Sequence, residues 1–257
     1  MNNKNIVLLV LLIAATVAVI FFVSKDKTGS KTGEFTINQI STSTEVKIGG
    51  SDASEKTTVK TIATPSLDRV VIASTLESDL RNQLTSQIKE TSTALKNNTG
   101  YFDGWIMLGS LRKMAGDYEG ARDAWEYASA ISPSNYVSFG NLGDLYQYYL
   151  KDYLRAEKNM LTVVKNKVDN IAGYRNLYNL YTQSYKEKIN EAPKILLSGL
   201  SKNPNNLDLI VLLAQYYVGV GDKSNATKYY ELGITQAEKE GNVSLKQSLE
   251  SELSGLK

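Results

Sequence analysis

Ser110 and Lys113 are the two residues whose types and spacing come nearest to a catalytic pair. The stretch SLRK places them three residues apart, a spacing that some Ser–Lys nucleophile pairs use. The same stretch falls inside a predicted helix, which favours coincidence over catalysis. The chain contains no His and no Cys, which excludes a Ser-His-Asp triad, a Cys nucleophile and imidazole or thiolate metal sites. We therefore expect no enzyme activity, no metal and no cofactor.

Acidic residues are also concentrated after Gly116, as Asp117, Glu119 and Asp123. They belong to a predicted exposed turn and helix start, where carboxylates favour the helix dipole. The whole chain contains 29 Lys and Arg residues and 27 Asp and Glu residues, so the formal net charge is +2. This balance gives no indication of nucleic-acid binding.

An uncharged apolar stretch, IVLLVLLIAATVAVIFFV, covers residues 6–23. As a helix it would span roughly 27 Å, close to the hydrocarbon thickness of a bilayer. We predict that residues 1–24 form a single-pass transmembrane signal anchor in contact with the lipid bilayer; a cleaved signal peptide is the alternative. A count of flanking Lys and Arg slightly favours a cytoplasmic downstream side, but the short amino-terminal tail favours an extracytoplasmic domain, which we expect.

The next segments change from polar to apolar and periodic. Residues 25–65 are rich in Ser and Thr and bury too little apolar surface to fold, so they are predicted to form a flexible linker. From Ser66 onwards, apolar residues recur every three or four positions, among them Leu80, Leu84 and Ile88. This pattern predicts one or more capping helices over residues 66–100.

The remaining chain repeats itself with a period of about 34 residues. A recurring Leu stands at steps of 34, 35 and 36 residues, and a recurring Ala at steps of 35, 36 and 34. The Leu residues are Leu108, Leu142, Leu177 and Leu213, and the Ala residues are Ala121, Ala156, Ala192 and Ala226. Each unit is long enough for two helices and a turn, which indicates a helical solenoid. Small residues on one helix face large ones on the other, as in a knob-and-hole arrangement.

The first unit, WIMLGSLRKMAGDYEGARDAWEYASAISP, resembles a tetratricopeptide repeat (TPR). The match is carried by Trp105, Leu108, Gly109, Gly116, Tyr118, Ala121, Trp125, Ala128 and Pro133. Arg112 departs from the family pattern, which has Tyr there, whereas later units carry Tyr146, Tyr181 and Tyr217. The third unit has an expanded turn. The resemblance implies an all-α fold, a right-handed α-α superhelix of about four repeats over residues 101–240.

A terminal repeat exposes an apolar face that must be covered. Leu245, Leu249, Leu253 and Leu256 recur at helical spacing in the last residues. We predict a carboxy-terminal capping helix over residues 241–257.

TPR proteins typically bind a protein or peptide on a concave face lined by their first helices. In the repeat register, the candidate partner-binding residues are Asp144, Gln147, Tyr148, Tyr149, Arg175, Asn179 and Gln215. Tyr148 and Tyr149 are of interest because tyrosine is enriched in interface hot spots. The alternative is that the many tyrosines of the second and third units pack with their hydroxyls at the surface.

These features together predict a membrane-tethered TPR scaffold for protein–protein or protein–peptide interaction, without catalysis. The alternative is a structural subunit of an envelope or secretion assembly, with its repeat surface permanently occupied.

Overall fold

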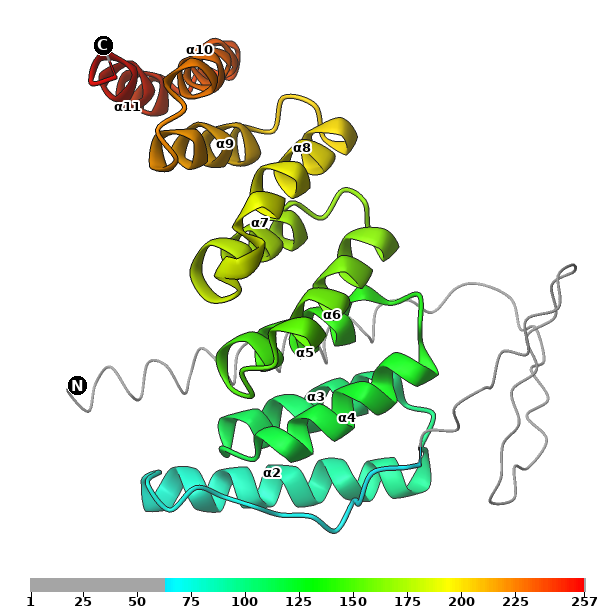
Figure 1. Ribbon diagram of the computed structural model, residues 1–257. Coiled ribbons are helices and arrows are strands. Elements are labelled where there is room, and N and C mark those ends of the chain that lie inside the picture. The colour runs from blue at the N-terminus through cyan, green and yellow to red at the C-terminus, as the bar shows by residue number, and fades with distance from the viewer. Residues whose placement is uncertain (1–62, 257) are drawn as a thin grey trace, which may run out of the picture. The chain divides into compact units, whose positions relative to one another are not determined.

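The computed structural model describes residues 63–256, and every regular element in this range is a helix. Residues 63–77 form an extended segment, here called the strap, which precedes α2 (Figure 1). The helices are α2 (Ser78–Asn97), α3 (Phe102–Met114), α4 (Tyr118–Ile131), α5 (Tyr136–Tyr148), α6 (Tyr153–Asn166), α7 (Ile171–Asn179), η1 (Leu180–Ser184), η2 (Lys186–Glu191), α8 (Ala192–Lys202), α9 (Leu207–Gly219), α10 (Lys223–Lys239) and α11 (Val243–Ser254). From α3 to α10 the helices form four successive pairs, which confirms the predicted repeat architecture.

Short polar side chains start most of these helices. Asp117, Asp152 and Asp222 cap the second helices α4, α6 and α10, each accepting a hydrogen bond from a backbone N–H in the first turn. Asn residues cap the first helices α5, α7 and α9, as well as α11. Such caps satisfy backbone donors that the helix itself leaves free. The repeat period is therefore also a period of helix starts.

In the first two repeats, close packing between the two helices depends on a glycine facing a large residue. A Cβ on Gly109 would collide with the Trp125 indole, and one on Gly143 would lie 2.7 Å from Cγ of Met160. Trp125 is 2 % exposed, and its indole N–H donates to the carbonyl of Ile106 at 3.1 Å. The predicted pairing of small and large side chains is confirmed at both positions. Three buried clusters follow one another along the chain and form the core.

The third repeat departs from the regular geometry where the sequence predicted an expanded turn. Its first helix, α7, continues as the π-helix η1, and the 3₁₀-helix η2 leads into α8. Glu157 stabilises this connection by accepting bonds from the Tyr181 hydroxyl at 2.8 Å and from Lys188 Nζ at 2.6 Å. The added residues are therefore held by the second helix of the preceding repeat.

The start of the amino-terminal cap differs from the prediction. The sequence predicted helix from about Ser66, but α2 begins at Ser78 and the strap before it is not helical. Leu67, Val70, Ile72 and Leu76 of the strap pack against the core of α2, α3 and α4. Their spacing suits a helix, but these contacts and the polar bonds described below hold the strap extended.

At the other end, α11 covers the last repeat. Leu249 is buried, and Leu245, Leu253 and Leu256 pack against the third cluster. No helix within residues 63–256 combines the length and the apolar character needed to cross a membrane. The predicted anchor at residues 6–23 and nearly all of the predicted linker lie outside the described residues.

Candidate functional site

Two adjoining pockets lie along the first helices of the first three repeats. The first lies between α5 and α7, has a volume of about 220 Å³, and is lined by Tyr136, Val137, Gly140, Asn141, Met160, Val163, Asn170, Ala172, Gly173 and Asn176. The second lies between α3 and α5, has a volume of about 320 Å³, and is lined by Ser110, Lys113, Met114, Trp125, Asn141 and Tyr149. Such volumes are close to the lower limit for small-molecule sites, and they suit individual side chains.

Asn141 lines both pockets, and Asn176 lines the first. Both residues stand directly before the recurring Leu of their repeat, Leu142 and Leu177. A first helix places this position beside the buried Leu but turned about 100° around the helix axis. Sequence reasoning missed these two amides, although their equivalent register was a signal that could have found them.

An ion pair between the first two repeats borders the second pocket. Lys113 Nζ lies 2.5 Å from Oδ2 of Asp144, and it also lies 4.7 Å from the centre of the Tyr149 ring. The Tyr149 ring is in turn 4.7 Å from that of Tyr118, the first residue of α4. Because both members of the ion pair are partly exposed, it contributes at most about 1 kcal/mol. It does, however, pair Lys113, the charged residue among those that line the pocket, with a carboxylate.

Ser110 and Lys113, the possible catalytic pair of the sequence, bind different groups. The Ser110 hydroxyl donates to the carbonyl of Ile106 at 3.0 Å, whereas Lys113 binds Asp144. The two side chains share the second pocket, and we assign them to its lining.

The residues predicted to bind a partner are distributed unevenly. Tyr149 lines the second pocket, Asp144 borders it through Lys113, and Tyr148 is 45 % exposed but lines neither pocket. Gln147 is 1 % exposed, because its side chain faces the third repeat and Nε2 donates to Ser184 Oγ at 3.0 Å. The assignment of Gln147 to a binding face is therefore wrong.

Three further candidates lie on later first helices. Arg175 and Asn179 are on α7 and Gln215 is on α9. Arg175 and Gln215 are exposed and Asn179 is half-buried. None of the three lines either pocket.

A second set of polar contacts is made by the residues at one repeat position, which is Arg112 in the first repeat and Tyr146 and Tyr181 in the next two. The Tyr146 hydroxyl donates to Glu126 at 2.7 Å, and burial together with this bond raises the pKa of Tyr146 to about 12. Burial and the bond to Glu157 also raise the pKa of Tyr181. Each tyrosine thus binds a carboxylate on the second helix of the preceding repeat.

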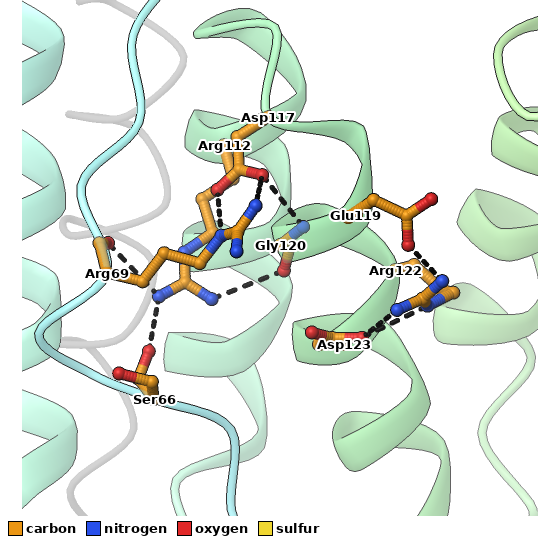
Figure 2. A network of polar contacts seen from close by, with 8 residues as sticks. All are labelled: Ser66, Arg69, Arg112, Asp117, Glu119, Gly120, Arg122 and Asp123. Atoms are coloured by element: carbon orange, nitrogen blue, oxygen red, sulfur yellow. Dashed lines mark hydrogen bonds and ion pairs between the residues drawn. The ribbon is translucent and has the colours of Figure 1, made fainter.

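Arg112 takes the equivalent place in the first repeat and binds the strap (Figure 2). Its Nη2 donates to the carbonyl of Ser66 at 2.7 Å, and its Nη1 donates to the carbonyl of Gly120 at 3.2 Å. The side chain is almost fully buried, and desolvation lowers the pKa of its guanidinium. The departure from the family residue is therefore explained by a backbone partner that only the first repeat has.

Asp117 lies beside Arg112 and is bound from the strap by Arg69. The two distances are 2.7 Å from Nε to Oδ2 and 2.5 Å from Nη2 to Oδ1, so the pair is bidentate (Figure 2). Burial alone would raise the pKa of Asp117, but the bonds from Arg69 and from the Gly120 N–H hold it below its usual value. The strap thereby supplies the counter-charge of a buried carboxylate.

Comparison with known proteins relies on structure, since no family model matches the chain and no curated protein matches its sequence significantly. The crystal structure of MamA has a TM-score of 0.50 and 14 % identity, and the match covers 65 % of this chain and 99 % of MamA. Pseudomonas aeruginosa pilF has a TM-score of 0.47 and 18 % identity, covering 69 % and 86 % of the two chains.

YrrB, described as a TPR protein with an unusual peptide-binding site, has a TM-score of 0.44 and 12 % identity, covering 65 % and 92 %. At these identities the likeness concerns the fold alone. Taken with the repeat period and the helix pairs from α3 to α10, the similarity to MamA shows that this chain has the tetratricopeptide-repeat fold.

Proposed function

We propose that the chain is a non-catalytic scaffold, tethered to a membrane through residues 6–23, that binds an extended peptide segment of a partner protein. The observation that carries this proposal is the pair of adjoining pockets that share Asn141. Two side-chain-sized pockets separated by one amide suit a peptide, whose side chains enter the pockets while its backbone passes between them.

The lining of the pockets defines the chemistry of that segment. An Asn amide offers both donors and an acceptor, so Asn141 and Asn176 can each bind a backbone peptide group. Val137, Met160 and Val163 make the first pocket largely apolar, which suits an aliphatic side chain. The two charges beside the second pocket neutralise each other. The favoured partner segment is therefore uncharged, and its affinity depends little on salt.

Selection of peptides from a random library on the full-length protein tests whether the two pockets bind a peptide. A labelled peptide recovered in this way should bind the Asn141→Ala variant about tenfold more weakly, the loss expected for an ordinary hydrogen bond. The matched control is Asn159→Ala, which removes an amide of similar exposure on α6, a second helix. Equal affinity of wild type and Asn141→Ala, or a strong decrease in affinity with salt, would contradict peptide binding in the two pockets.

Membrane tethering is supported by the apolar stretch at residues 6–23, and it would raise the local concentration of a bound partner. The absence of Cys from the sequence permits a direct test with a single introduced thiol. Ser251→Cys on the exposed side of α11 should be labelled in intact cells by a membrane-impermeant maleimide. Labelling only after lysis would refute the extracytoplasmic orientation, and recovery of the chain in the carbonate-soluble fraction would refute the anchor.

A further inference from the structure

The strap is fastened to the end of α3 and to the turn that follows it. Arg69 binds Asp117 with two hydrogen bonds, and the backbone N–H of Ala73 donates to the carbonyl of Ala115 at 2.7 Å. Arg112 returns a bond to the strap backbone at Ser66 (Figure 2). Because these bonds join both side chains and backbone, the strap helps to determine where the α3–α4 turn lies.

The register of the repeats shows what the strap replaces. In the second and third repeats, Tyr146 and Tyr181 bind carboxylates on the second helix of the repeat before them. Before the first repeat the described chain has α2 and the strap. Arg112 extends to the strap carbonyls, which take the place of those carboxylates. The strap is thus the polar partner of the first repeat at a position where the second and third repeats use the helix before them.

The same short region also builds the second pocket. Lys113 follows Arg112 in the last turn of α3 and lines the pocket. Tyr118 follows Asp117 and packs against Tyr149, which lines the pocket from the second repeat. Two contiguous paths therefore connect the strap with the pocket, although the strap itself lines neither pocket.

We propose that docking of the strap controls the second pocket. When the strap is docked, the end of α3 and the start of α4 hold Lys113 and Tyr149 in the positions that form the pocket. When it is released, these side chains lose their support and the affinity for peptide falls. The affinity part of this inference rests on the proposed function, whereas the structural coupling does not. By thermodynamic linkage, a peptide bound in the pocket must favour the docked strap by the same factor.

Hydrogen exchange of backbone amides in the full-length chain tests the coupling without a partner. Arg69→Gln removes the bidentate bond to Asp117 and is expected to accelerate exchange about tenfold in the strap, in residues 110–118 and in residues 145–150. The turn between α9 and α10 should be unaffected. Arg155→Gln is the matched control for residues 110–118, since Arg155 Nε lies 3.3 Å from Asp152, the N-cap of α6, and that turn has no strap. Residues 145–150 are not compared in this control, because Arg155 Nη1 also donates to the Tyr146 hydroxyl at 3.4 Å.

Acceleration confined to the strap would overturn the proposed coupling, as would equal acceleration of residues 110–118 by Arg155→Gln. Far-UV circular dichroism checks that Arg69→Gln keeps its helices; Arg69→Lys, which retains the charge but not the planar fork, serves as a milder variant and should exchange at an intermediate rate.

Peptide affinity provides the second measurement. The labelled peptide selected on wild type should bind Arg69→Gln about tenfold more weakly and should slow exchange of the strap in wild type. Unchanged affinity in Arg69→Gln would overturn the inference. If wild type selects no peptide, the proposed function fails, whereas the exchange rates of residues 110–118 still decide whether the strap controls the pocket.

Discussion

The turns α3–α4 and α9–α10 have the same local design in different surroundings. Gly116 and Gly221 both have a positive φ, +82° and +76°, and each is followed by an aspartate, Asp117 or Asp222, that caps the next helix. In both turns the cap accepts a backbone N–H at 3.0 Å. Both turns therefore combine a glycine that allows the left-handed conformation with an aspartate that caps the next helix.

The difference lies in what covers the aspartate. Asp117 is 3 % exposed and is bound by Arg69 from the strap, whereas Asp222 is half-buried and is bound within its own helix by Asn225. A Cβ on Gly116 would lie 3.0 Å from that of Ala73 in the strap, whereas one on Gly221 would have open space around it. Local residues thus form both turns, whereas the strap, which is distant in sequence, buries the aspartate of the α3–α4 turn.

Removing the two aspartates should separate the two turns most clearly. Asp117→Ala is expected to lower the free energy of unfolding by about 3 kcal/mol, because it leaves the buried Arg112 and the partly exposed Arg69 without their counter-charge. Partial exposure of Arg69 keeps this value at the lower end of the range for broken buried pairs. Asp222→Ala loses only a cap and should have a distinctly smaller effect. Urea unfolding of both variants measures the difference, and equal losses would contradict the special role of the strap.

Replacing Gly116 and Gly221 by Ala should also destabilise the α3–α4 turn more than the α9–α10 turn, but by a smaller difference in unfolding free energy. Alanine at either position is strained by the positive φ, which costs about 1 kcal/mol. Gly116→Ala must also displace Ala73 in the strap, so we expect about 2 kcal/mol there. Thermal unfolding of Gly116→Ala and Gly221→Ala provides the measurement. An equal loss of unfolding free energy in the two variants would show that displacing Ala73 in the strap costs no free energy.

Low pH should weaken the α3–α4 turn, because it protonates Asp117. The pKa of Asp117 is held below its ordinary value of 3.8. The stabilisation from its ionised form is therefore complete above about pH 4 and is lost as the pH falls through the lower, folded-state pKa. Unfolding free energies measured from pH 5 to pH 2 should fall more steeply for wild type than for Asp117→Asn. Parallel curves would argue against a buried, ionised Asp117.

The last effect appears only at high pH and concerns Tyr146, which stands at the register position of Arg112. Its pKa of about 12 lies above the ordinary value of 10. The unfolded chain ionises first, so stability is retained below pH 10 and lost as the pH rises from about 10 to 12. Tyr146→Phe should make this alkaline loss smaller without abolishing it, because the pKa of Tyr181 is also raised. Unfolding followed by circular dichroism across this range checks the prediction.

Much of the fold was predictable because its causes are local or periodic. The spacing of recurring Leu and Ala residues predicts helix pairs, since each repeat must bury the same face against its neighbour. Gly109 and Trp125 were predicted to pack because their sizes are complementary and their register is fixed by the repeat. The expanded third turn was visible as extra residues, although its π-helical and 3₁₀ forms were not.

The candidate site was less predictable because exposure depends on small rotations about a helix. Gln147 falls at a register position expected to face a partner, yet the third repeat covers it. Asn141 and Asn176 stand beside a core residue and were missed, yet both line a pocket. The apolar spacing of residues 66–77 suits a helix equally well, and only contacts with distant residues hold this segment extended.

By itself, the amino-acid sequence determined the repeat period, the pairing of helices within each repeat and the close packing of small against large side chains, since each follows from interactions within a unit or between adjacent units. Only the tertiary structure decided that Arg112 binds the strap, that Asp117 is buried and that Asn141 joins two pockets. Those features depend on groups from segments far apart in the chain, whose positions become defined only when the repeats have packed.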